Sequence, residues 1–125
     1  MLKKIELEFP VRSSVKILYN KLSTSIGLQE WFADHVSNNK EIFTFSWGGD
    51  ERKARVIGSK ENDFIRFKWT DDAEKESFFE FKIRVDDLTG DVALVVTDFC
   101  EEDEEEETRR LWDHQIHELF HIIGS

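Results

Sequence analysis

The chain has 125 residues, enough for one domain, and its 27 Asp and Glu outnumber its 17 Lys and Arg to give a net charge of −10. This acidic balance, with a pI near 4.8, excludes a general nucleic-acid binder, which needs cations to displace counterions from phosphate. No apolar run approaches the ~18 residues of a membrane span, and the N-terminus lacks a secretory-signal pattern. The chain has a single cysteine, Cys100, and therefore no internal disulfide, so we expect a cytoplasmic protein.

The N-terminal quarter predicts one strand followed by two helices. Residues 4–9 alternate charged and apolar side chains, which is typical of a half-buried strand, and Pro10 is expected to end it. A serine at 13 or 14 can cap the following helix, whose apolar residues recur at helical spacing. Residues 23–25 break that pattern, and a short second helix is expected over residues 26–34.

From about residue 36 the apolar period changes to two, which predicts about six strands joined by tight turns. Gly48 and Gly49 mark a hairpin, and polar segments at 58–63, 70–72 and 86–90 mark further turns. This hairpin spacing makes the sheet antiparallel. The last strand, residues 92–97, is apolar on both faces, so we expect it to be central or covered on both sides.

The C-terminal end predicts one long helix preceded by an acidic run at residues 101–107. Residues 98–125 carry 10 acidic and 2 basic side chains, a net of −8, whereas residues 1–97 carry 17 and 15, a net of −2. Asp103 and Glu106 resemble a capping box, and Gly124 is expected to end the helix. A wide apolar stripe follows helical spacing: Leu111, Trp112, Ile116, Leu119, Ile122 and Ile123, with Phe120 at its edge.

A helix of roughly 20 residues would be about 30 Å long, enough to cross a sheet. Its apolar stripe must be buried, and the concave face of the sheet is the available partner. The element order therefore predicts an α+β helix-grip fold, with a curved antiparallel sheet wrapped round a long C-terminal helix and two short helices after the first strand. We expect a single domain over residues 1–125.

This arrangement resembles that of the START-like superfamily, the helix-grip or Bet v 1-like proteins. The similarity is carried by residues 15–32, ending in Trp-Phe, and by 43–47, 65–69 and 111–123, so it covers essentially the whole chain. It resembles most the small bacterial START-like domains near the activator of Hsp90 ATPase homologues, although it is shorter than those homologues and has the acidic run. The resemblance implies a hydrophobic cavity between sheet and helix for lipids, sterols or polyketides, or a co-chaperone-type interaction module without enzymatic activity.

Large aromatic side chains are unusually frequent, with 11 Phe and 4 Trp, and a small core needs so many only to pack a wide sheet or line a hollow. Ten residues on the faces expected to look inward are candidates to contact a small apolar, lipid-like or polyketide-like ligand: Phe43, Phe45, Trp47, Phe67, Trp69, Phe79, Phe81, Trp112, Ile116 and Leu119. The same rings could instead fill the space completely. Both alternatives stay open at this point.

The acidic run at 101–107 has two interpretations. It could dock a basic protein partner, since clustered carboxylates attract cations over a distance. Alternatively, it stabilises the start of the helix, because acidic side chains favour a helix N-terminus and Glu105 and Glu106 lie four residues before Arg109 and Arg110. The second interpretation is favoured, with docking as the alternative.

Three histidines, His114, His117 and His121, share one face of the predicted helix at a spacing that can chelate a transition metal. That face lies opposite the apolar stripe, whereas metal centres are recessed and supported by neighbouring groups, so we predict no metal site and no cofactor. Cys100 has acidic neighbours that disfavour the thiolate a nucleophile needs.

Three arginines, Arg55, Arg66 and Arg84, alternate away from the apolar faces and are expected to point outward. We therefore predict no catalytic residue. A cyclase or hydrolase, as some members of the resembled superfamily are, would need an inward ionisable group with a perturbed pKa. The sequence pattern nominates none.

Overall fold

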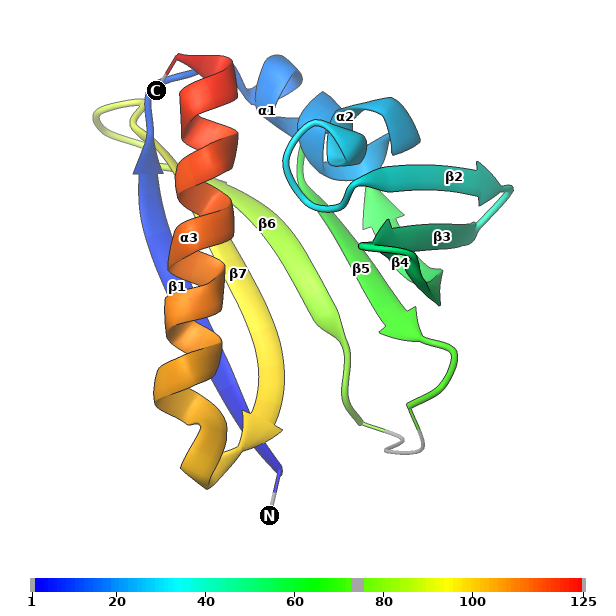
Figure 1. The fold of residues 1–125 in the computed structure, drawn as a ribbon. Coiled ribbons are helices and arrows are strands. Elements are labelled where there is room, and N and C mark those ends of the chain that lie inside the picture. The colour runs from blue at the N-terminus through cyan, green and yellow to red at the C-terminus, as the bar shows by residue number, and fades with distance from the viewer. Residues whose placement is uncertain (1, 73–75, 125) are drawn as a thin grey trace.

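The structure is a computed structural model that describes residues 2–72 and 76–124. One antiparallel sheet has the strand order β1-β7-β6-β5-β4-β3-β2, and α3 lies across its concave face beside β1 and β7 (Figure 1). The helix-grip prediction is confirmed. The elements in chain order are β1 (Leu2–Val11), α1 (Val15–Ser23), α2 (Ser25–Gln29), β2 (His35–Asn39), β3 (Ile42–Trp47), β4 (Asp50–Lys60), β5 (Phe64–Trp69), β6 (Phe79–Val85), β7 (Val92–Glu101), the short 3-10 helix η1 (Glu102–Glu104) and α3 (Glu105–Ile123).

The register of the central strands brings large apolar side chains side by side on the concave face. Phe67 on β5 lies opposite Phe79 on β6 and Val56 on β4, and Ile65 lies opposite Phe81. Because side chains two apart on a strand share a face, this pairing lines the concave face with rings and leaves charged residues outside.

The strand β7 is covered on both faces, as predicted from its sequence. It lies between β1 and β6, and Val95, on the face opposite Leu94 and Val96, is only 4% exposed. β7 continues to Glu101, beyond the expected end at residue 97. Cys100, expected after the strand, is therefore a buried residue within it.

Pro10 does not end the first strand, contrary to the prediction. β1 continues to Val11, and Pro10 lies opposite Ala93 of β7. β1 is an edge strand, where a residue that lacks a backbone N–H is tolerated because one side of the strand has no partner.

The two short helices are joined by a threonine that serves both. The Ser14 hydroxyl accepts from Ile17 N at 3.1 Å and caps α1, as expected for one of the two serines. Thr24 ends α1 and caps α2, accepting from Gly27 N at 2.9 Å. A Cβ on Gly27 would lie 2.4 Å from Asn20 O, so only glycine allows the helices to approach this closely. α2 ends at Gln29, earlier than the predicted residue 34, and the chain continues as turns.

The C-terminal helix α3 has 19 residues and is about 28 Å long. Its buried face is narrower than predicted, because Trp112, Ile116 and Leu119 are buried whereas Leu111 and Ile122 are exposed. The predicted capping box is wrong: Glu104 is the N-cap and makes no side-chain capping bond. Gly124 ends the helix in a left-handed conformation, as expected. None of the helices in the described ranges is long and apolar enough to cross a membrane.

Candidate functional site

All ten predicted ligand-contacting residues belong to one buried cluster or pack against it. Their rings, with two from the segment after α2, form a continuous set of contacts that we call the aromatic layer: Trp31, Phe32, Phe43, Phe45, Trp47, Phe67, Trp69, Phe79, Phe81 and Trp112. Ile116 and Leu119 of α3 are fully buried beside it. The structure therefore brings the predicted residues together.

The centre of the aromatic layer is densely packed. Phe45, Phe67 and Phe81 have no exposed surface, and the rings of Phe67 and Phe79 stack with centroids 4.9 Å apart. Phe32, which the sequence analysis did not nominate, contacts six other rings at centroid distances of 5.1 to 6.1 Å. Large rings therefore occupy the space between the middle of the sheet and α3.

A hollow of about 490 Å³ opens at the edge of this layer, between α3 and the segment after α2. We call it the α3 hollow, and it is lined by residues 29–34, Trp47, His114, Gln115 and Glu118. Figure 1 shows the loop after α2 curving toward α3. Of the ten predicted residues, Trp47 is the one that lines this hollow.

One backbone carbonyl holds the three walls of the α3 hollow together. The oxygen of Phe32 accepts from Trp47 Nε1 at 2.8 Å and from Gln115 Nε2 at 3.2 Å. These bonds join β3, the segment after α2 and α3. Asp34 adds a further tie, since its Oδ2 accepts from Gly48 N at 2.8 Å. The hollow is thus formed by groups that are already fixed in position.

An inward carboxyl that the sequence analysis missed, that of Asp98, lies beside Trp112 of the aromatic layer. Asp98 on β7 accepts from Trp112 Nε1 at 2.9 Å through Oδ2 and from Phe99 N at 2.8 Å through Oδ1. Burial raises the pKa of Asp98, although these hydrogen bonds oppose the shift. Because Asp98 follows Val96 by two, alternation along β7 predicts its inward direction once the strand is known to continue past residue 97.

The three arginines point outward, as expected, and each contacts a carboxylate. Arg66 Nε lies 2.7 Å from Glu80, and Arg84 Nη1 lies 2.8 Å from Glu8. Arg55 pairs with Glu41 at 3.2 Å. These side chains form ion pairs on the outer face of the sheet and do not face the aromatic layer.

The histidine face of α3 is exposed, and His114 is the member that lines the α3 hollow. Within residues 2–72 and 76–124, no group of three or more His, Cys, Asp or Glu side chains is arranged to hold a metal ion.

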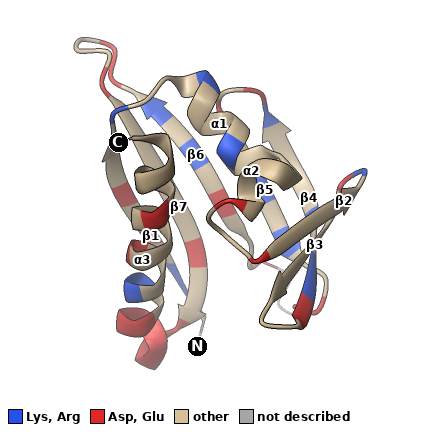
Figure 2. Ribbon diagram, turned by 45° about the horizontal axis from the view of Figure 1, so that its top comes forward, with Lys and Arg blue, Asp and Glu red and all other residues tan. Residues whose placement is uncertain are grey.

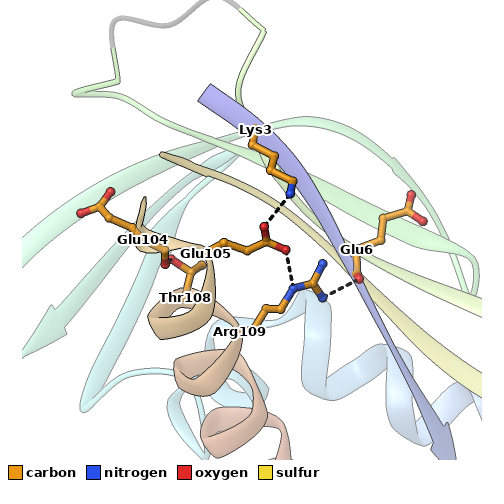
Figure 3. Close-up of polar contacts among 6 residues, drawn as sticks. All are labelled: Lys3, Glu6, Glu104, Glu105, Thr108 and Arg109. Carbon is orange, nitrogen blue, oxygen red and sulfur yellow. Dashed lines mark hydrogen bonds and ion pairs between the residues drawn. The ribbon is translucent and has the colours of Figure 1, made fainter. Parts of the chain in front are cut away.

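The acidic run stabilises the start of α3 through Glu105 (Figure 3). The Glu105 carboxylate lies 2.6 Å from Lys3 Nζ and 2.9 Å from Arg109 Nε, and the Arg109 guanidinium also donates to Glu6 O at 3.1 Å. The hydrogen bond from Lys3 lowers the pKa of Glu105. Glu106 pairs with Arg110 at 3.8 Å, so both predicted ion pairs along the helix are confirmed, and Lys3 was the unforeseen partner.

The comparisons with known proteins agree with the geometry. A family model described as a START-like superfamily domain matches residues 1–125, whereas no curated protein matches the chain. A solution structure of the protein BfR322 from Bacteroides fragilis is 39% identical, with a TM-score of 0.70 over 97% of this chain and 90% of that chain.

Two more distant solved structures share the fold. The Aha1 dimer from Colwellia psychrerythraea has a TM-score of 0.81 at 15% identity, over 97% of this chain and 96% of that chain. CalU16 from Micromonospora echinospora has a TM-score of 0.76 at 13% identity, over 98% of this chain and 76% of that chain. Because the family model spans the whole sequence and the Bacteroides relative is 39% identical, this chain belongs to the START-like superfamily.

Proposed function

We propose that this domain binds a small ligand with a flat, apolar body in the α3 hollow. The observation that carries the proposal is a hollow of about 490 Å³ whose lining combines three aromatic residues, Trp31, Phe32 and Trp47, with polar and charged side chains. Ligand sites are typically concave and about 300–1,000 Å³ in volume, and this hollow falls within that range. The START-like fold is compatible with ligand binding, and the volume of this hollow supports the proposal.

The proposed site lies at the edge of the aromatic layer rather than at its centre. A ligand at the centre would have to displace rings such as Phe67 and Phe81, which have no exposed surface. The packing of such a ring is worth roughly 3–5 kcal/mol, the stability lost when a buried phenylalanine is replaced by alanine. The α3 hollow needs no such opening, because it already lies open at the surface. The hydrogen bonds to Phe32 O also hold its walls in position before a ligand binds.

A titration with naphthylmethanol, an uncharged probe with a flat aromatic body, tests the proposal. The four tryptophan indole N–H signals are followed in two-dimensional ¹H–¹⁵N NMR spectra. We expect saturable shifts that include the signal of Trp47. Gln115→Trp places a bulky ring in the hollow and should abolish binding, whereas Gln115→Leu loses the same bond to Phe32 O but leaves space and should still bind. Equal binding by both variants would place the probe elsewhere.

A second candidate function is the docking of a basic protein partner at the acidic run. In Figure 2 the ribbon is red, the colour of Asp and Glu, at the first turns of α3. Glu102, Asp103 and Glu104 are exposed just before these turns and take no part in the ion pairs of Glu105. Fluorescence anisotropy with a labelled oligolysine peptide tests this. Changing those three residues to amides should weaken binding more than changing three exposed carboxylates elsewhere, Glu51, Glu61 and Asp87. Equal weakening would show that only the net charge matters.

A further inference from the structure

We propose that the α3 hollow selects ligands that carry an organic ammonium group on their apolar body. This inference rests on the proposed function, since it names the ligand class for the same hollow. It follows from the charge of the lining, from one lining carboxylate without a partner in the described residues and from a tryptophan in the lining.

The lining of the α3 hollow is acidic. It contains three carboxylates, Glu30, Asp34 and Glu118, and neither lysine nor arginine. With histidine counted as neutral, the lining carries a formal charge of −3, of which the Lys21 ammonium paired with Glu30 offsets one. A cleft with charge of one sign on low-dielectric walls raises the local concentration of ions of the opposite sign. An anionic ligand such as a fatty acid is therefore disfavoured here.

The three carboxylates differ in what they already bind. Glu30 forms an ion pair with Lys21, and Asp34 accepts from Gly48 N. Glu118 is exposed on α3 and has neither an ion pair nor a hydrogen bond to any residue that the structure describes. Glu118 is thus the carboxylate that a bound cation can engage without displacing an existing partner.

One lining residue, Trp47, offers an aromatic ring that suits a cation. Trp47 is half-buried, and its indole N–H is already donated to Phe32 O, which holds the ring in place. Ammonium groups are attracted to the face of tryptophan more strongly than to other aromatic rings. The chain uses this contact next to the hollow, where the Arg52 guanidinium lies 4.0 Å from the centroid of Trp69, itself 6.1 Å from Trp47.

A charge series of matched probes tests the inference. Naphthylmethylammonium, naphthylmethanol and naphthylacetate share one apolar body and carry a positive charge, no charge and a negative charge. Their dissociation constants are measured by the same NMR titration at about 0.15 M salt, where exposed charges are screened beyond about 8 Å. We expect the cation to bind about 3- to 30-fold more tightly than the alcohol, and the anion more weakly than either.

Two variants separate a local effect from the overall negative charge of the chain. Glu118→Gln should lower the ratio of cation to alcohol affinity about two- to fivefold. Glu107→Gln removes the same charge from an exposed position on α3, about 16 Å along the helix from Glu118, and should leave the ratio within about 1.5-fold of the wild-type value. Equal falls in both variants would overturn the assignment of Glu118.

The outcomes distinguish this inference from the proposed function. If the alcohol and the ammonium bind equally in the α3 hollow, the proposed function stands and the ammonium preference is refuted. If neither probe binds there, the proposed function itself fails. A preference for naphthylacetate would refute the charge argument directly.

Discussion

The substitution Phe32→Ala tests whether the aromatic layer is a packed core. Phe32 is 5% exposed and contacts six rings, so its removal leaves a cavity among side chains from the sheet, the segment after α2 and α3. Replacing a buried phenylalanine by alanine costs about 3–5 kcal/mol. With a urea m-value near 2 kcal/mol per molar, the unfolding midpoint should fall by about 2 M.

A matched control uses the same substitution on the outer face of the sheet. Phe78 is half-buried, contacts one ring, that of Phe99 at 5.0 Å, and lies 4.1 Å from the Arg66 guanidinium. Its partial burial predicts a loss of about 1–2 kcal/mol for Phe78→Ala. Urea denaturation followed by circular dichroism measures both. A loss below about 1 kcal/mol for Phe32→Ala, or equal losses at the two positions, would refute a densely packed layer.

Three further predictions concern packing and charge. Gly27→Ala should lower the melting temperature, because the new Cβ would lie 2.4 Å from a backbone oxygen; an unchanged melting temperature would contradict the close helix approach. Burial raises the pKa of Asp98, so ionisation of this carboxyl opposes folding. In urea denaturation, the stability of the wild type should therefore fall relative to that of Asp98→Asn as pH rises from about 4. A stability difference that does not change with pH would contradict this. In thermal denaturation, Glu105→Gln should destabilise the protein most at pH values above the ordinary pKa of an unfolded glutamate, and the effect should be lost as pH falls through the lowered folded pKa of Glu105. High salt should reduce the effect, and Glu107→Gln should change little. Equal effects of the two substitutions would deny the role of the Lys3 pair.

The fold was predictable because its apolar periods are strong and long. The change from a period of 3.6 to a period of two near residue 36, and the return to helical spacing before Trp112, identify the elements. The ends of elements were less predictable. Pro10 is accepted because β1 is an edge strand, and α2 is shortened because the following turns bring Phe32 into the core. Both depend on tertiary contacts between residues far apart in the sequence.

The candidate site was predictable only in part. Alternation along the strands places residues such as Phe45, Phe67 and Phe81 on the inner face, but the volume left between rings depends on how side chains from different elements interlock. The α3 hollow is lined by Gln29, the last residue of α2, and by the irregular residues 30–34, over which the sequence pattern predicted that the helix continues. Asp98 escaped notice because β7 was expected to end one residue before it.

The decisive measurement of ligand binding in the α3 hollow is the set of contacts between a bound probe and assigned side chains. Intermolecular nuclear Overhauser effects would be recorded between naphthylmethanol and isotopically labelled protein. If the probe binds in the α3 hollow, we expect effects to Trp47 and Gln115 and none to the rings of Phe45 and Phe67. Strong effects to Phe67 and Ile116 would show instead that the probe enters between the sheet and α3 by opening the core, and would contradict the proposed site.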